Sequence, residues 1–545
     1  MAIHVRIEGH ECEAEPGLSL FDCAERIGLP IINSCGKQGK CRECLVEVTE
    51  GSDLLTPPAE DERHLRGKFR LACRARVGGA GGAIGFHRMR WSGVQIFDAG
   101  EISAARSEAP FDPAVTRDGA VVLLDGEPVA HGAGPLHGLA LDIGTTTVVV
   151  RLVDLGTGDV RATSSFENPQ RFAGSDVMAR IAYAATDGEG RLRSALTAYV
   201  NQAVAAFPCD PDTIYEVVAV GNPTMRDLFF GLDVGSLGVC PYRSLTEHEL
   251  GAGRRSATSI SADARRLGLH VHPKARAFGL PLIGGHVGAD AAACALAVDA
   301  LNQDRLIALL DIGTNTELLV GTRQRMLAAS CPAGPAFEGG TISCGMPAFS
   351  GAIESVRLAG NGAPLCGVIG GGTPRGICGS GLVSALGEML KAERMSRLGR
   401  IGARRFVLDA GADIYLSERD ISRLAQAKGA LAAGWTLVMR RYGADYGELE
   451  QLYLAGGFAN SLDLGAASRI GLIPQIPEGR IQRIGNAAIE GATLALRSVT
   501  LRGELESFVK GIDHVELEED EGFFQAFVDG CQFKPLSGTA SERPS

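Results

Sequence analysis

The chain has 545 residues, enough for three or four domains, and its 45% hydrophobic and 21% charged residues are ordinary for a globular protein. Its net charge of −11 argues against nucleic acid as the main partner, because binding phosphate backbones requires a basic face. No apolar leader follows Met1 and no apolar run is long enough to span a bilayer, so we expect a cytoplasmic protein that does not bind membranes. Its 14 cysteines are then expected to be thiols or metal ligands rather than disulfides.

Residues 1–88 are predicted to form a compact domain that opens with a β-hairpin. Residues 3–7 alternate as a strand does, a turn follows at 8–10, and a helix is expected from Ser19 to about Gly28. The next segment, 89–136, contains polar stretches, glycine and proline, and we interpret it as a linker with one short strand pair around 120–129. The polar residues 537–545 are expected to be a disordered tail.

Four cysteines of the first domain have the spacing of an iron–sulfur site. They form a C-x5-C-x2-C loop with one distant partner, and are Cys35, Cys41, Cys44 and Cys73. Plant-type [2Fe–2S] domains use the same plan with a loop one residue shorter. Gly36 and Gly39 would let backbone amides turn toward the sulfur atoms. The segment resembles the ferredoxins with the longer loop, which have a β-grasp fold. Four thiolates also suit tetrahedral zinc, although zinc sites more often pair two C-x2-C units and only one occurs here.

Two similar turns follow the linker. The first, Asp142-Ile143-Gly144-Thr145-Thr146-Thr147, interrupts an apolar run at 139–153, and Asp311-Ile312-Gly313-Thr314-Asn315-Thr316 interrupts a second one at 307–321. Each run is predicted to be strand, turn and strand. Backbone amides in such turns can bind phosphate oxygens, while the aspartate can hold Mg²⁺ through water. Two copies far apart indicate two related halves rather than a repeat array.

Three further motifs accompany the turns in a fixed order. Residues 284–296 place Asp290 before a helix of small residues, 452–460 end a strand at Gly456 and Gly457, and 485–492 begin a second small-residue helix. This order resembles the family of acetate and sugar kinases, Hsp70 and actin. The resemblance implies two RNase H-like halves with MgATP between them, divided here into 137–206 and a C-terminal ATPase domain at 207–536.

The same resemblance supplies the expected roles in the nucleotide site. The two turns would face each other across a cleft, Gly456 and Gly457 would approach the adenosine, and the two small-residue helices would cross at a hinge. Asp142 and Asp311 would serve catalysis as metal carboxylates, and Asp290 would orient the attacking water. The nucleotide-binding residues implied are Asp142, Gly144, Thr145, Thr146, Thr147, Asp311, Gly313, Thr314, Asn315, Thr316, Gly456 and Gly457. Thr314 stands where the commoner form of the second turn has glycine.

Nearly the whole chain resembles the reductive activators of corrinoid proteins. Further landmarks at 220–225, 332–340 and 376–382 fit that family, although Pro223 stands where threonine is expected. The fold class implied is a multidomain α+β and α/β protein, with a β-grasp [2Fe–2S] domain and a two-lobed RNase H-like ATPase. The function implied is ATP-dependent reduction of Co(II) to Co(I) on the corrinoid protein of a methyltransferase system. An upstream electron donor is then required, and a homodimer is compatible with the sequence.

Two other functions remain open on the residues alone. A small-molecule kinase with an accessory ferredoxin domain would need an acceptor pocket and a general base, and no motif supplies them. An activator of a radical dehydratase would hold a [4Fe–4S] cluster through cysteines of the ATPase lobes. Four cysteines in that region leave this open, but their irregular spacing favours buried thiols; they are Cys331, Cys344, Cys366 and Cys378.

Overall fold

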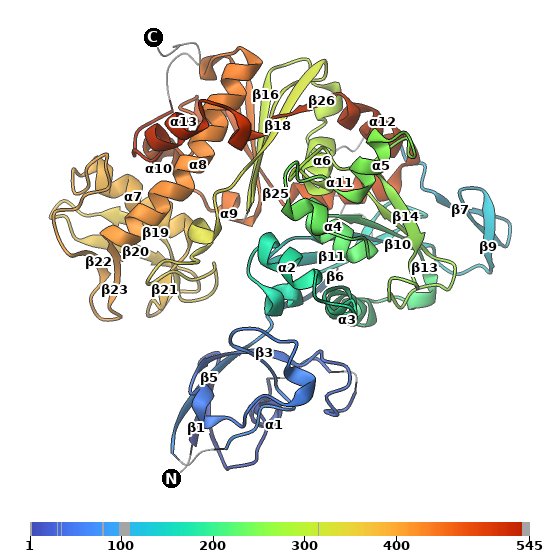
Figure 1. Cartoon of the computed structure of the whole chain (residues 1–545), viewed down its shortest axis with the longest axis horizontal. Coiled ribbons are helices and arrows are strands. Elements are labelled where there is room, and N and C mark those ends of the chain that lie inside the picture. Colours follow the sequence, from blue (N-terminus) through green and yellow to red (C-terminus); the bar gives the residue numbers. More distant parts are fainter. Residues whose placement is uncertain are drawn as a thin grey trace. The chain divides into compact units, whose positions relative to one another are not determined.

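The computed structural model describes residues 3–29, 31–33, 35–78, 81–96, 109–313 and 315–536 (Figure 1). The chain forms two compact units. Each is one continuous stretch, except that residues 492–502, near the C-terminus, belong to the first unit and interrupt the second. Unit 1 comprises Met1–Pro281 and Ala492–Arg502, and unit 2 comprises Leu282–Gly491 and Gly503–Ser545. None of the described helices is both long and apolar enough to cross a bilayer.

The N-terminal part of unit 1 is a five-stranded sheet with one helix packed on it, drawn in blue in Figure 1. Its elements are β1 (Ile3–Ile7), β2 (His10–Ala14), α1 (Leu20–Arg26), β3 (Leu45–Glu50), β4 (Phe69–Leu71) and β5 (Gly82–Arg88). The strand order is β2-β1-β5-β3-β4, with β1 parallel to β5 and antiparallel to β2. Ser19 caps α1, because its hydroxyl accepts a hydrogen bond from Asp22 N–H at 3.1 Å. The predicted hairpin, helix and β-grasp fold are confirmed.

The segment expected to be a linker contains more strands than the sequence suggested. Its strands are β6 (Trp91–Ile96), β7 (Val115–Asp118), β8 (Val121–Leu124) and β9 (Glu127–His131). The β8–β9 pair agrees with the expected strand pair, and β7 adds a third strand to that small sheet. β6 instead joins the edge of the large sheet of unit 1, where it pairs with β12 (Val160–Glu167). Stacking of Trp91 on Phe166 at 5.1 Å explains why this short strand is held there.

A seven-stranded sheet forms the rest of unit 1. Besides β6 and β12 it contains β10 (His137–Ile143), β11 (Thr147–Asp154), β13 (Ile214–Val220), β14 (Ile260–Asp263) and β15 (Arg276–Gly279). Its order is β14-β15-β13-β10-β11-β12-β6. The helices of this part are α2 (Val177–Ala184), α3 (Arg191–Ala206), α4 (Pro223–Phe230) and α5 (Leu245–Gly251). β13 and β15 extend the sheet in parallel from β10, so unit 1 ends at Pro281, whereas the sequence-based limit stands at 206/207.

Unit 2 repeats this plan around a six-stranded sheet. The strands are β16 (Ile307–Ile312), β17 (Thr316–Thr322), β18 (Arg325–Cys331), β24 (Gln451–Ala455), β25 (Ile481–Gly485) and β26 (Ile512–His514). Their order is β25-β24-β16-β17-β18-β26. Five of these strands, β25-β24-β16-β17-β18, match β15-β13-β10-β11-β12 of unit 1 in order and direction: three strands are antiparallel and the other two extend the sheet in parallel. Two RNase H-like halves, as expected from the two turns, are confirmed.

Helices and a smaller strand region complete unit 2. The helices are α6 (Ala289–Ala297), α7 (Gly379–Lys391), α8 (Glu418–Tyr442), α9 (Gly457–Asn460), α10 (Leu464–Ile470), α11 (Ala487–Arg497, shared with unit 1), α12 (Val499–Lys510, also shared) and α13 (Phe523–Gly530). The additional strands are β19 (Ala352–Leu358), β20 (Pro364–Val368), β21 (Gly376–Ile377), β22 (Arg405–Asp409) and β23 (Ile414–Ser417). Trp435 of α8 is fully buried and anchors the core of this unit.

Candidate functional site

The structure brings the four predicted cluster cysteines together in two pairs. Cys44 directly precedes β3 and Cys73 follows β4, and the antiparallel register of these strands sets Leu45 opposite Leu71. The Sγ atoms of Cys44 and Cys73 therefore lie 3.4 Å apart, and both side chains are buried. Cys35 and Cys41 form the second, partly exposed pair, with Cys41 hydrogen-bonded to the Cys35 sulfur. Two pairs of thiolates suit the two iron atoms of a [2Fe–2S] cluster.

Backbone amides of the cysteine loop surround the Cys35 sulfur. Burial opposes ionisation of this thiol, but N–H groups of Cys41, Gln38 and Lys40 donate to it and lower its pKa to about 7. The loop can turn this tightly because Gly36 and other residues adopt positive φ. An electron-rich metal-bound sulfur needs such donors, so the loop fits the cluster predicted for it.

Arg74 clamps this loop from outside. Its guanidinium donates to the Gln38 carbonyl at 2.8 Å and to Asp61 at 2.6 Å. A Cβ at Gly39 would lie 2.3 Å from the Arg74 Nε atom, so only glycine fits without displacing the clamp. No motif marks Arg74 in the sequence, and its position directly after Cys73 is the available signal.

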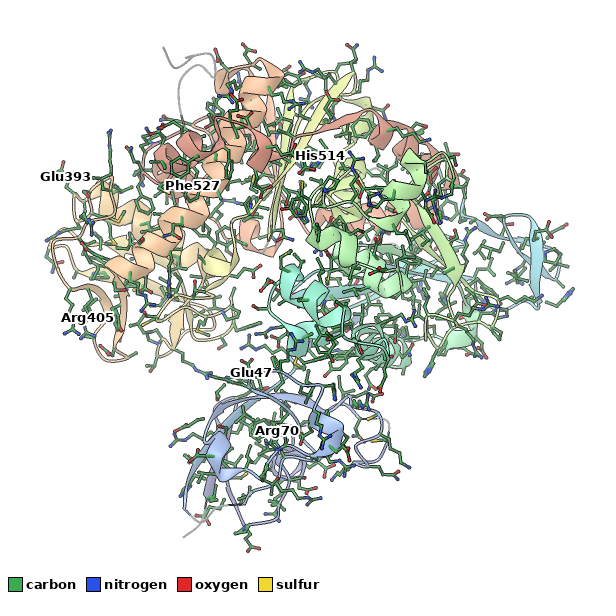
Figure 2. The ribbon with its side chains drawn as sticks, in the orientation of Figure 1. Glu47, Arg70, Glu393, Arg405, His514 and Phe527 are labelled. Atoms are coloured by element: carbon green, nitrogen blue, oxygen red, sulfur yellow. The ribbon has the colours of Figure 1, made fainter. Side chains whose placement is uncertain are left out.

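A buried ion pair fixes the segment that leads to Cys73. Arg70, labelled in Figure 2, donates to Glu62 at 2.9 and 3.0 Å, and Leu71 N–H donates to the same carboxylate at 2.8 Å. The carboxylate is thus paired with a charge and with a backbone donor, which offsets the cost of burying it. It holds β4 in the register that places Cys73 beside Cys44.

The first phosphate-type turn lies in unit 1 between β10 and β11. Asp142 stands near the end of β10, and the side chains become progressively more exposed from Thr145 through Thr146 to Thr147. Gly144 is required, since a Cβ there would lie 2.5 Å from the Thr147 carbonyl oxygen. The turn is therefore compact, with Thr145 buried and Thr147 exposed.

Polar side chains from three other segments brace this turn. Asn168 donates to the Gly144 carbonyl at 2.8 Å, and Asn222 donates to the Thr145 hydroxyl at 3.0 Å. Arg180 donates to the Thr145 carbonyl at 2.6 Å. Asn222 also caps α4, which gives the predicted landmark at 220–225 a structural reason. Asn168 and Arg180 carry no motif and were missed from the sequence.

The second turn lies in unit 2 between β16 and β17. Asp311 keeps some surface exposure as a residue, yet protein atoms crowd its carboxyl group and burial raises its pKa to about 6. The Cys294 thiol of α6 donates to it at 3.5 Å. Gly313 and Asn315 are partly exposed, Thr316 is buried, and Thr314 lies outside the described residues.

Glu317 is a buried carboxylate that the sequence analysis did not assign to the site. It stands opposite Asp311 in the β16–β17 register and is 5% exposed. Burial first, and then the negative charges of Asp290 and Asp311, hold its pKa well above the usual range. Its Oε1 atom has no hydrogen-bond partner among the described residues. The sequence signal for Glu317 was the short spacing within the predicted hairpin, which places positions 311 and 317 opposite each other on one face of the sheet.

Asp290 is the third carboxylate of this group. It lies in the first turn of α6 but does not cap the helix, because the N-cap position is Gly288. Its Oδ1 atom accepts a hydrogen bond from Ala291 N–H at 2.9 Å. In the described part of the chain no three ligand side chains converge closely enough to hold an ion directly. Asp290, Asp311 and Glu317 lie close enough for the charges of the two aspartates to raise the pKa of Glu317.

The remaining predicted residues also surround Asp311 in unit 2. A Cβ at Gly456 would lie 2.6 Å from the Ile312 carbonyl oxygen and 3.0 Å from Asp311 Oδ1, so this glycine packs on the turn. A Cβ at Gly457 would meet no atom within 4 Å. α6 and α11 cross in close contact, because a Cβ at Gly491 would lie 1.9 Å from the Ala293 carbonyl oxygen. The two small-residue helices are therefore in contact, and their crossing at a hinge stays a prediction.

The four cysteines of the ATPase region have separate surroundings. Cys344 contacts the Asp413 carbonyl at 3.8 Å, Cys366 the Leu408 carbonyl at 3.7 Å and Cys378 the Ile353 carbonyl at 3.4 Å. Cys331 is fully buried on β18. These contacts favour isolated thiols, in agreement with the interpretation of their spacing.

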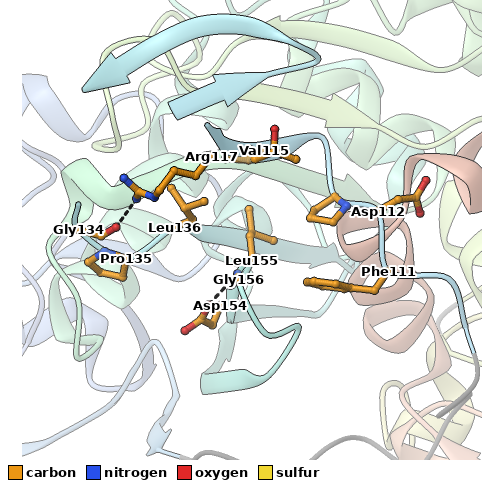
Figure 3. Close-up of a pocket in the computed structure, with 12 residues that line it drawn as sticks. Phe111, Asp112, Val115, Arg117, Gly134, Pro135, Leu136, Asp154, Leu155 and Gly156 are labelled. Atoms are coloured by element: carbon orange, nitrogen blue, oxygen red, sulfur yellow. Dashed lines mark hydrogen bonds between the residues drawn. The ribbon is translucent and has the colours of Figure 1, made fainter. Parts of the chain in front are cut away.

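A pocket of about 480 Å³ lies elsewhere in unit 1, along the segment that follows β6 (Figure 3). Phe111, Val115, Leu136 and Leu155 give it an apolar lining, and none of its lining residues belongs to either predicted site. The candidate site is defined by the cysteine pairs and the two turns instead.

Fold and site geometry together define a class: a [2Fe–2S] domain joined to an ATPase-like domain of the acetate and sugar kinase, Hsp70 and actin type. Family models agree with each part. They match a 2Fe–2S iron–sulfur cluster binding domain at 3–78, the RACo middle region at 137–303 and the C-terminal ASKHA domain of RACo at 305–541. The chain belongs to the family of reductive activators of corrinoid proteins.

Individual relatives extend over most of the chain. The corrinoid activation enzyme RamQ of Eubacterium limosum is 28% identical over 94% of this chain and 95% of its own length. A Co(II) methylated amine-specific corrinoid protein reductase of Methanosarcina barkeri is 26% identical over 71% of this chain and 75% of its own. A solved reductive activator for corrinoid, iron–sulfur protein has a TM-score of 0.69 and 26% identity, with 98% of each chain covered.

Proposed function

We propose that this protein uses ATP to transfer one electron from a [2Fe–2S] cluster to the Co(II) of a corrinoid protein, which regenerates Co(I). The observation that carries the proposal is that one chain holds a pair of cysteine sulfurs in contact and a group of buried carboxylates. The Sγ atoms of Cys44 and Cys73 lie 3.4 Å apart and would hold part of the cluster. Asp311 and Glu317 stand opposite each other in the nucleotide-binding fold and would face the hydrated cation. The names of the relatives support the corrinoid substrate.

The electron balance explains why ATP is needed. Plant-type clusters have potentials near roughly −400 mV, and the Co(II)/Co(I) couple is generally lower, so the transfer is uphill. Each ~59 mV of mismatch costs about tenfold in a one-electron equilibrium. When bound, the cluster would supply one electron for each Co(II) reduced, and an upstream donor of low potential would have to replace that electron.

The residues of the cluster domain have binding and tuning roles in this scheme. Cys35, Cys41, Cys44 and Cys73 would hold the irons, and the cluster supplies the one-electron chemistry when bound. Amides of the loop stabilise the negative sulfur of Cys35, while Arg74 keeps the loop closed and adds a positive charge beside Cys73. Both effects favour the more negative, reduced state of the site.

In the ATPase part, Asp142 and Asp311 would hold Mg²⁺ through water, and the amides and hydroxyls of the two turns would bind phosphate oxygens. Gly457 leaves room for the adenosine, Asp290 orients the attacking water, and Glu317 adds a carboxylate next to both Asp290 and Asp311. ATP and Mg²⁺ would favour one closure state of the protein, and a corrinoid protein bound more tightly in that state becomes easier to reduce. The cytoplasmic location and the homodimer expected from the sequence stay predictions.

Anaerobic mixing of the reduced protein, MgATP and a Co(II) corrinoid protein tests the proposal, with the visible spectrum reporting Co(I). We expect Co(I) only when all three are present. In Asp142→Ala we expect the cluster to be retained but ATP no longer to promote Co(I) formation. In Cys44→Ser we expect nucleotide binding to be retained but electron transfer to be lost. Equal Co(I) formation without ATP would overturn the role of the nucleotide.

The same preparation separates the two alternative functions. ATPase activity stimulated by the corrinoid protein favours reductive activation, whereas stimulation by a small hydroxylated substrate would indicate a kinase. Two irons per chain, all lost when the N-terminal cysteines are replaced, favour the [2Fe–2S] domain as the electron carrier. Iron that survives those replacements would indicate a cluster held by the ATPase lobes.

A further inference from the structure

Arg180 of α2 is a fully buried arginine whose charge no carboxylate balances. Its side chain is 0% exposed. The guanidinium donates to the Thr145 carbonyl at 2.6 Å, to the Gly174 carbonyl at 3.2 Å and, at 3.5 Å, to the Gln170 amide oxygen, and it contacts the Met225 sulfur at 3.0 Å. All four acceptors are neutral. Within the described residues Arg180 makes no ion pair.

The other buried arginines of unit 1 are each paired with a carboxylate. The ion pairs are Arg70 with Glu62 at 2.9 Å, Arg226 with Asp227 at 2.7 Å and Arg502 with Glu216 at 2.7 Å. Removing a guanidinium from water costs several kcal/mol unless a counter-charge offsets it. A carboxylate supplies this counter-charge at three buried arginines, whereas no carboxylate of the described residues pairs with Arg180.

Nearby charges do not supply the missing partner. Burial first, and then the positive charge of Arg171, lower the pKa of Arg180 to about 9, and among the causes only Asp176 acts in the opposite direction. Asp176 is exposed and its carboxylate caps α2 by accepting from Ala179 N–H at 2.9 Å. Arg180 thus remains cationic at neutral pH and is held directly against the first phosphate-type turn.

We propose that the phosphate chain of the nucleotide is the counter-charge of Arg180, which makes Arg180 a positioning residue for phosphate binding. This inference rests on the proposed function, because it needs ATP at the first turn. By donating to the Thr145 carbonyl, Arg180 fixes the backbone of the turn next to the partly exposed Thr146 and the exposed Thr147. Its charge favours a polyanion, so the ligand class is a nucleoside triphosphate ahead of a diphosphate or monophosphate.

Calorimetry with ATP, ADP and AMP tests this on the full-length protein and on Arg180→Met and Arg180→Lys. We expect Arg180→Met to weaken ATP binding by about tenfold to a hundredfold, ADP less and AMP little, since charge-assisted contacts contribute on that scale. Arg180→Lys, which keeps the charge, is expected to recover most of the ATP affinity. The control is Arg171→Met, which removes the same charge from a side chain that is already paired with Glu167.

The outcomes are distinct. A wild-type protein that binds no ATP contradicts the proposed function itself. If ATP binds but Arg180→Met weakens all three nucleotides equally, or Lys restores nothing, Arg180 is structural and the inference is wrong. Should the Met variant not fold, Arg180→Gln replaces it with the same expectation: ATP binding weakens by about tenfold or more and AMP binding changes little. Equal weakening of all three nucleotides in Arg180→Gln likewise overturns the inference.

Discussion

Asp311 and Glu317 stand directly opposite each other across the β16–β17 hairpin, and Asp290 adds a third negative charge beside Glu317. Such a group is unfavourable in a folded protein unless a cation or protons neutralise it. The group of carboxylates therefore lowers the stability of the ligand-free protein, as expected for a site that binds a cation.

Asp311→Asn is expected to stabilise the nucleotide-free protein at alkaline pH. Burial raises the folded-state pKa of Asp311 to about 6 from 3.8, so the stability linked to its proton is complete below about pH 4 and lost as pH rises through 6. The loss amounts to at most about 3 kcal/mol. Melting temperatures without Mg²⁺ should show a gain for the variant at pH 8 that shrinks toward pH 5. A gain that is constant with pH would contradict the assignment.

Glu317→Gln is expected to raise the Mg²⁺ concentration needed for half-maximal ATPase activity by roughly tenfold, because a carboxylate next to the hydrated cation is lost. A Mg²⁺ titration at saturating ATP measures this. Glu448→Gln, on an exposed side chain of the same unit, is the control and should leave the titration unchanged. An unaltered Mg²⁺ requirement in Glu317→Gln would make this carboxylate structural.

Asp290→Asn is expected to bind ATP with near-normal affinity and to hydrolyse it at least about tenfold more slowly, because general acid–base and positioning roles are worth that much or more. Single-turnover hydrolysis and calorimetry on one preparation separate the two quantities. Because Asp290 is not the N-cap of α6, the melting temperature of the Asp290→Asn protein should differ little from that of the wild type. A clear fall in melting temperature with normal hydrolysis would identify a structural residue.

Cys44→Ser is expected to remove the visible absorption of the cluster and leave ATP affinity intact, because the cluster domain has its own core. Iron analysis and the visible spectrum measure the loss. Cys12→Ser is the matched control, since Cys12 lies on β2 and contacts the Cys23 carbonyl instead of the cysteine pairs. Two irons and a normal spectrum in Cys44→Ser would disprove the ligand set.

Gly491→Ala is expected to lower the stability of unit 2. A Cβ there meets the Ala293 backbone at 1.9 Å, and relieving such overlap costs about 1–3 kcal/mol, more than the gain of about 1 kcal/mol in helix propensity. Gly503→Ala in α12 provides the opposite case, because open space surrounds Gly503 and only the propensity gain applies. Thermal melts should therefore move in opposite directions for the two variants.

Local patterns were enough to predict the elements that carry the chemistry. Alternation in residues 3–7 and the capping residue Ser19 predicted β1 and α1, and the two apolar runs broken by Asp142 and Asp311 predicted the paired hairpins. The linker was harder to predict. β6 is stabilised by Trp91 stacking on Phe166, 75 residues away in sequence, and no local pattern reports such a contact.

The sequence by itself determined the ligand types, their spacing and the duplication of the turn, because these depend on neighbouring residues and on strand and turn preferences. Tertiary structure decided which other side chains act on the cysteines and on the two turns. The register of β3 and β4 pairs Cys44 with Cys73, the β16–β17 hairpin sets Glu317 against Asp311, and α2 delivers the Arg180 charge to Thr145. Burial then changes the chemistry of these groups: an arginine or a glutamate has an ordinary pKa in the chain, and only its surroundings in the fold shift it.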